Sequence, residues 1–169
     1  MNTPTAFLND ITRILSDYLS ERLPKLGGGV WWEKLVLKSL SYPQRDRCRR
    51  EGYTELADLD LASLLKVFQN NFDLLCNTDG DLSFESKPLF FELSYVRNRA
   101  AHIGAKGLGL RVIERDLQTM MLVLEALKYS EAVYYGVAAA WREALQRLNA
   151  ICAEANSLPG HICPATLPA

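Results

Sequence analysis

Apolar residues at helical spacing dominate this chain of 169 residues and constrain its fold most strongly. In the first stretch they recur every three or four positions, at Phe7, Ile11, Ile14, Leu15, Tyr18 and Leu19. That spacing is the apolar stripe of an amphipathic α-helix. Pro24 and the glycines at 27–29 are expected to end this helix. No stretch shows a convincing strand pattern, so the sequence indicates an all-α protein.

The same spacing predicts further helices along the chain. They are expected over Trp31–Leu40, Leu61–Cys76 with Asp60 as N-cap, Pro88–Gly104, about Leu110–Tyr129, and Ser130–Asn156. We therefore predict an all-α bundle of about five to seven helices. Residues 1–130 are expected to form the bundle, and residues 131–156 a C-terminal helix packed on it or at an oligomer seam. Residues 157–169 are expected to be a disordered tail.

Composition excludes several functional classes. A net charge of -1, from 19 basic and 20 acidic residues, argues against indiscriminate nucleic-acid binding and leaves room only for a local basic patch. The first residues lack a secretory signal, and no apolar run approaches the roughly 20 residues that span a bilayer. The four cysteines are far apart, without a CxxC pair. We expect reduced thiols, no metal, no cofactor, no membrane contact and a cytoplasmic location.

Four arginines crowd a six-residue segment after Pro43: Arg45, Arg47, Arg49 and Arg50. They could bind an RNA phosphate backbone. Alternatively, the segment is a solvated loop with local ion pairs to Asp46 and Glu51. Lys106 could extend the same basic patch.

Two other groups admit a functional interpretation. Trp31 and Trp32 could stack on exposed bases, although their helical spacing favours core packing. Glu92, Glu114 and Asp116 do not converge on one helical face, so surface salt bridges are favoured over a metal site.

The segment Arg97-Asn98-Arg99-Ala100-Ala101-His102 carries the clearest chemical pattern. On an α-helix Arg97 and His102 lie about 140° apart, whereas Asn98 shares the face of His102 and can orient its imidazole. Histidine, with an ordinary pKa of about 6.5, suits proton transfer, and arginine suits phosphate. One copy offers a single acid/base, so two copies across a two-fold axis would complete a site. Alternatively, His102 only caps the helix end.

The order of features along the chain resembles the HEPN superfamily and its RX4-6H motif. After an amphipathic first helix come Trp31-Trp32-Glu33, Pro43-Gln44-Arg45, Leu59-Asp60-Leu61 and the stretch Tyr95–His102. The likeness covers about residues 5–128. It is to the subtype at the C-terminus of a nuclear transcript-quality-control endoribonuclease and in prokaryotic conflict-system proteins. The resemblance implies a dimer with juxtaposed motif helices, and RNA cleavage without a metal that leaves a 2′,3′-cyclic phosphate.

By this resemblance Arg97 and His102 take the catalytic positions and Asn98 the polar one, and we expect Arg99 beside them to contact RNA. The leading prediction is a homodimeric, metal-independent endoribonuclease in bacterial stress response or antiviral defence. An antitoxin or a larger complex subunit is a further expected partner. The alternative is a non-catalytic HEPN module for RNA binding or assembly with a larger partner.

Overall fold

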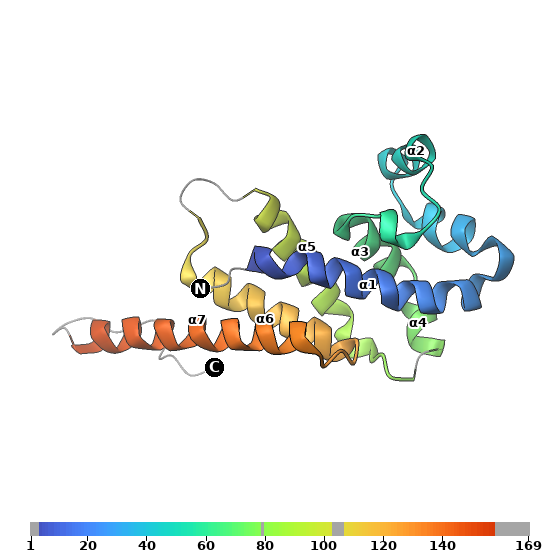
Figure 1. Cartoon of the computed structure of the whole chain (residues 1–169). Helices are drawn as coiled ribbons and strands as arrows, with labels where there is room; N and C mark the ends of the chain where they lie inside the picture. The colour runs from blue at the N-terminus through green and yellow to red at the C-terminus, as the bar shows by residue number, and fades with distance from the viewer. Residues whose placement is uncertain (1–3, 79, 103–106, 158–169) are drawn as a thin grey trace.

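The computed structural model describes residues 4–78, 80–102 and 107–157, and every regular element in these ranges is helical. The α-helices in Figure 1 are α1 (Pro4–Gly27), α2 (Tyr42–Glu51), α3 (Leu61–Asn70), α4 (Phe72–Thr78), α5 (Lys87–Ala101), α6 (Leu110–Ala126) and α7 (Ala132–Ser157). Short helical turns link them: η1 (Gly28–Val30), η2 (Trp32–Val36), η3 (Leu37–Ser39), η4 (Leu56–Asp58) and η5 (Phe84–Ser86). The predicted all-α bundle is confirmed.

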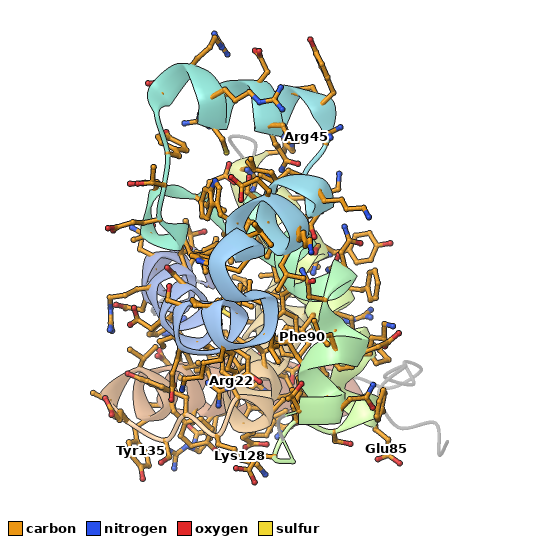
Figure 2. The ribbon with its side chains drawn as sticks, turned by 90° about the vertical axis from the view of Figure 1, so that its right-hand side faces the viewer. Arg22, Arg45, Glu85, Phe90, Lys128 and Tyr135 are labelled. Atoms are coloured by element: carbon orange, nitrogen blue, oxygen red, sulfur yellow. The ribbon has the colours of Figure 1, made fainter. Side chains whose placement is uncertain are left out.

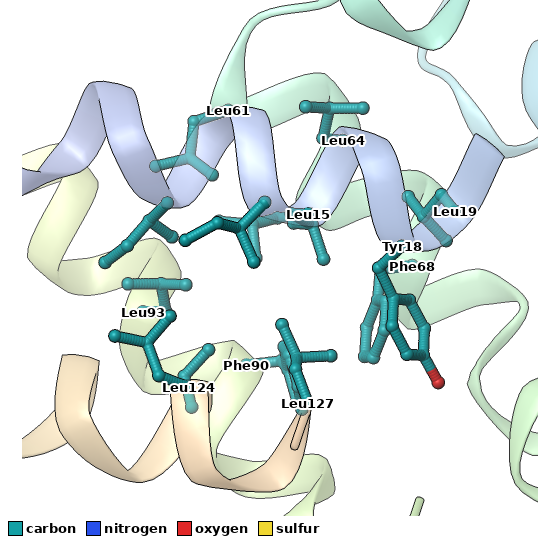
Figure 3. Packing of buried hydrophobic residues seen from close by; sticks show 14 of the residues in the cluster. Leu15, Tyr18, Leu19, Leu61, Leu64, Phe68, Phe90, Leu93, Leu124 and Leu127 are labelled. Atoms are coloured by element: carbon teal, nitrogen blue, oxygen red, sulfur yellow. The ribbon is translucent and has the colours of Figure 1, made fainter. Parts of the chain in front are cut away.

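One hydrophobic core holds the bundle together. Helix α1 contacts α3, α5, α6 and α7, so it lies across most of the other long helices. At the centre the rings of Phe68 and Phe90 stack with centroids 4.0 Å apart, and leucines such as Leu15, Leu93 and Leu124 surround them (Figure 3). All five side chains are fully buried or nearly so. Burying side chains of this size stabilises the fold by about 1.5–3 kcal/mol each.

Helix α3 begins where the sequence predicts and ends earlier. The Asp60 carboxylate accepts a hydrogen bond from the Ser63 backbone N–H at 2.8 Å, which confirms the predicted N-cap. The predicted helix Leu61–Cys76 was wrong in its extent, because it breaks at Asn71. The buried Asn71 amide donates to the Leu35 and Val67 carbonyls, both at 2.8 Å. A side chain held by η2 therefore sets the kink between α3 and α4.

The segment after α1 departs from regular α-helix. Helix α1 passes through Pro24 and continues to Gly27, because Leu23 in this turn is fully buried. The predicted helix Trp31–Leu40 is instead a π-helical turn flanked by 3-10 turns. Trp31 and Trp32 are half-buried against the core, with their rings edge to face at 5.4 Å. This placement favours the core-packing interpretation of the two tryptophans.

Helix α2 stands away from the bundle at one end of the molecule (Figure 1). It begins at a capping box in which Ser41 and Gln44 bond each other, and it ends at Gly52, whose φ of 69° suits glycine. A bond from Gln44 Nε2 to Ser63 Oγ at 3.1 Å joins it to α3, and its Cys48 side chain is buried in the core cluster. The interpretation of this segment as a loop was wrong, since the capping box and the αL glycine close a regular helix.

Helix α7 lies alongside α6 and also contacts α1. Its Val137 and Ala144 are fully buried, and Trp141 Nε1 donates to Glu114 Oε1 at 2.6 Å. The tail predicted for residues 157–169 lies outside the described residues except for Ser157, which ends α7. None of the helices in the described ranges is long and apolar enough to cross a bilayer.

Candidate functional site

Helix α5 carries the Arg97–His102 motif at its C-terminal end. The helix begins at Lys87, after the N-cap Ser86, with Pro88 in its first turn, and it packs into the core through Phe90, Leu93 and Val96. Figure 2 shows Phe90 inside the bundle. The opposite face carries exposed side chains that include Phe91, Tyr95, Asn98 and His102. We call these four residues the α5 ridge.

His102 lies immediately beyond the last turn of α5. The helix was predicted to continue to Gly104 but ends at Ala101, because the His102 backbone N–H bonds the Arg99 carbonyl at 3.1 Å in a tighter turn. The His102 side chain is exposed and makes no hydrogen bond to the described residues. Its imidazole is therefore open to a ligand. Lys106, predicted to bind RNA, lies outside the described residues.

Asn98 bonds Arg97 in this structure. The exposed Asn98 side chain accepts a hydrogen bond from Arg97 Nη1 through Oδ1 at 3.2 Å. The two side chains therefore act as a pair, and the amide steadies the guanidinium. The predicted contact between Asn98 and the His102 imidazole is not formed in the described structure, although both side chains lie on the α5 ridge.

The Arg97 side chain extends from α5 toward the start of α3. Its side chain is one-third exposed, at 33%, and its Nη2 lies 3.8 Å from Asp60 Oδ2. The other Asp60 oxygen caps α3. One carboxylate therefore both starts α3 and faces the arginine. Both groups are reached by water, so this ion pair is weak, at about 0–1 kcal/mol.

Arg97 borders two surface hollows. One, of about 340 Å³, lies between α1, α3 and the end of α5. The other, of about 310 Å³, lies between α2, α3 and α5, and we call it the polar groove. The polar side chains that line this groove are Gln44, Lys66, Gln69, Ser94, Arg97 and Asn98. The groove therefore runs from the motif to α2.

Arg99 points to the opposite side of α5, toward α6. Its Nε donates to Asp116 Oδ2 at 3.1 Å and its Nη2 to Asp116 Oδ1, a bidentate pair. The Asp116 side chain is only 1% exposed, whereas that of Arg99 is 38% exposed. Asp116 does form a salt bridge, but the prediction that it lies at the surface was wrong, because Arg99 on α5 covers its carboxylate. Arg99, predicted to bind RNA, already uses two of its donors inside the protein.

Glu92 and Glu114, which were considered with Asp116 as a possible metal site, bond to different side chains. Glu92 accepts from Thr119 Oγ1 at 3.2 Å and lies 3.8 Å from Arg115, and Glu114 accepts from Trp141. In the described ranges no group of three or more His, Cys, Asp or Glu side chains could hold a metal ion.

The arginines of α2 divide into two kinds. Arg50 forms an ion pair with Asp46 at 3.0 Å, as one predicted alternative had it. Arg45, Arg47 and Arg49 form no ion pair with the described residues. The structure therefore brings α2 to the motif through Gln44 and the polar groove, but it does not bring these arginines into the motif itself.

Sequence reasoning missed Lys66. It is exposed, on a helix whose neighbouring residues Leu64, Leu65, Val67 and Phe68 are buried. A lone lysine in such an apolar stretch was the available signal. Its place opposite Arg97 depends on how α3 packs against α5, which no local pattern shows.

A family model described as Swt1-like HEPN matches residues 7–128, well over half of the chain. The chain belongs to this family. Membership in the HEPN family points to a ribonuclease or an RNA-binding module. The match ends just after α6, so α7 lies outside the matched HEPN region. No match was found among curated proteins or solved structures.

Proposed function

We propose that this HEPN domain is a metal-independent endoribonuclease that works as a homodimer. The observation that carries the proposal is the exposed end of α5, where His102 and Asn98 lie open on the ridge with Arg97 beside them. The chemistry follows from the residue types. One histidine accepts the proton of the RNA 2′-hydroxyl as its oxygen attacks phosphorus, and a second gives a proton to the departing 5′-oxygen.

The second histidine comes from a second copy. The α5 ridge continues from the motif into two large apolar side chains, Phe91 and Tyr95, which are 47% and 63% exposed. Aromatic residues are enriched at protein interfaces. A two-fold axis across this ridge buries these side chains and places the two His102 residues at one cleft.

Arg97 supplies the positive charge. As the 2′-oxygen–phosphorus bond forms, negative charge develops on the phosphoryl oxygens, and a guanidinium binds two such oxygens with its planar fork. When the bond from phosphorus to the 5′-oxygen breaks, the products are a 2′,3′-cyclic phosphate and a 5′-hydroxyl. Asn98 keeps the guanidinium in place through its bond to Nη1.

The test is cleavage of total RNA in the presence of EDTA. We expect the parent protein to cut, and His102→Ala to cut about 10²- to 10⁴-fold more slowly, the range for loss of a general acid/base. Arg97→Ala should lose about 10²- to 10³-fold, the range for loss of a charge-stabilising donor. The matched controls are His161→Ala, which removes the other histidine of the chain, and Arg147→Ala on α7.

Two results would reject the proposal. One is equal cleavage by the parent and His102→Ala proteins. The other is RNA binding by the parent without any cleavage, which would establish the alternative of a non-catalytic RNA-binding module. The dimer is tested separately by Tyr95→Glu, which should yield a monomer in sedimentation and abolish cleavage while the helical signal is kept. A role in bacterial stress or antiviral defence, with an antitoxin or larger partner, belongs to this same proposal.

A further inference from the structure

We propose that the polar groove is a binding site for the RNA strand that flanks the cleaved bond, with Lys66 holding a neighbouring phosphate. This inference rests on the proposed function for the position of the cleaved phosphate at Arg97. The groove begins at Arg97 and Asn98 on α5, crosses α3 at Lys66, and reaches α2 at Gln44. Two separated cations therefore line one continuous hollow of about 310 Å³.

Lys66 is available to a ligand. Its side chain is exposed and forms no ion pair or hydrogen bond with the described residues. The other cation of the groove, Arg97, faces Asp60 at 3.8 Å, whereas Lys66 has no carboxylate partner among the described residues. A lysine ammonium is a point charge that suits a phosphate without demanding a fixed orientation. An unpaired lysine across a groove from Arg97 is therefore suited to a second phosphate of the same strand.

The remaining walls of the groove are fixed by internal bonds. Gln69 Nε2 donates to the Phe90 carbonyl and to Ser94 Oγ, both at 3.0 Å. Gln44 is held by its bonds to Ser41 and Ser63. These side chains are ordered before any ligand binds, so little side-chain entropy is lost when a strand enters. The polar lining of the groove consists of amides, a hydroxyl and two cations, and it contains no carboxylate.

The groove also gives the basic helix α2 a role. Gln44 lines the groove, and Arg45 and Arg49, four positions apart, share the next face of α2. Figure 2 places Arg45 on the side of α2 that faces the rest of the protein. Neither arginine forms an ion pair with the described residues. A strand leaving the groove past Gln44 therefore meets two unpaired guanidinium groups.

The positions of the nearby carboxylates determine the charge along this path. Asp60 faces Arg97 at 3.8 Å, and Asp46 is paired with Arg50 on the outer side of α2. Neither lines the groove. The local charge along the path is therefore positive, although the whole chain has a net charge of -1. Positive potential confined to one groove steers a polyanion to that groove.

The test measures binding of a 2′-O-methyl RNA of about 12 nucleotides, within the site sizes of single-strand binding folds. This probe lacks the 2′-hydroxyl and cannot be cut, so binding is read independently of cleavage. Fluorescence anisotropy at several salt concentrations gives the slope of log affinity against log salt. We expect Lys66→Gln to reduce that slope by about 0.7 and the Arg45→Gln, Arg49→Gln double variant by about 1.4, the values for one and two lost single-strand phosphate contacts.

The matched control is Arg147→Gln, which removes an exposed positive charge on α7 and should leave the slope unchanged. All the substituted side chains lie at the surface, and thermal unfolding verifies that the variants stay folded. An unchanged slope in Lys66→Gln or in the α2 variant overturns the inference, as does a parent protein that binds no RNA. If the slopes fall as expected and ordinary RNA is still not cut, the groove stands and the proposed catalytic function fails.

Discussion

Breaking the buried pair between Arg99 and Asp116 should destabilise the protein unequally, depending on which partner is removed. Arg99→Met keeps most of the side-chain stem but leaves the Asp116 carboxylate, only 1% exposed, without its bidentate partner. Stranding one member of a buried pair costs about 3–5 kcal/mol. Because the Arg99 side chain is itself 38% exposed, water can partly replace it, and we expect the lower end, about 3 kcal/mol. For a chain of this length that corresponds to a fall in Tm of about 6–12 °C.

The reverse substitution should be milder. Asp116→Leu leaves a guanidinium that already reaches solvent, so Arg99 can turn outward and recover its hydration. We expect a loss of about 1 kcal/mol, in line with pairs that have one exposed partner. The double variant Arg99→Met, Asp116→Leu should lose no more stability than Asp116→Leu alone, since a buried ion pair replaced by apolar side chains is often close to neutral.

Urea unfolding of the parent, both single variants and the double variant measures these free energies as a cycle. The control is Arg147→Met, whose partner Glu143 lies in an exposed i,i+4 pair and whose loss should change stability by less than about 0.5 kcal/mol. Equal and small losses in Arg99→Met and Arg147→Met would refute the reasoning. They would mean that Asp116 is solvated despite its burial.

Three other substitutions and reactions test the fold. Asn71→Ala removes three amide bonds to buried acceptors and should lower stability by about 1–3 kcal/mol in urea, whereas a change below about 0.5 kcal/mol would show that the kink does not need them. Gly27→Ala should lower the Tm, because the new Cβ would lie 2.5 Å from Trp31 Cβ; a higher Tm would contradict this contact. Burial raises the pKa of the Cys48 thiol, so Cys48 should react with a disulfide reagent more slowly than Cys152 below pH about 8.5. The native state holds this proton more tightly than the unfolded chain, so the stabilisation is complete below that pH and is lost as pH rises through the raised pKa; equal thiol rates by peptide mapping would contradict burial.

The spacing of residues in the sequence predicted helices well where their formation depends on residues close by in the chain. The apolar spacing of α1 and the Asp60 cap of α3 depend on residues within one or two turns, and both predictions held. The capping box of α2 was also present in the sequence, at Ser41 and Gln44, and was missed. The loop alternative for this segment therefore fails on a local signal, since Ser41 and Gln44 three positions later are the capping-box residues.

Two other failures, at Asn71 and Asp116, came from contacts between distant segments. Asn71 breaks a strongly periodic helix because its amide is bonded to the Leu35 carbonyl, 36 residues away in the chain. Asp116 is buried because Arg99, 17 residues away, covers it. Neither partner can be inferred from the spacing of residues on one helix, since each depends on the packing of two helices.

The candidate site also combines features set by nearby residues with features set by helix packing. The motif on α5 could be identified from the sequence, and helix geometry predicted that Arg97 and His102 lie on different faces. The side chains that border it from other elements were not readable. Asp60, Lys66 and Gln44 border the motif only because α3 packs beside α5 and Gln44 of α2 is bonded to Ser63 of α3.

The carboxylate of Asp60 makes the affinity of the site depend on the length of the ligand. Arg97 in the free protein already faces a negative group, so an incoming anion gains only the difference between its own contact and the one it displaces. A small anion that makes one contact gains little from that exchange. A strand that also reaches other cations gains from every additional phosphate. Occupancy therefore rises with the length of the ligand, and short nucleotide fragments, including the products of a cut, are weak competitors for the place of the next strand.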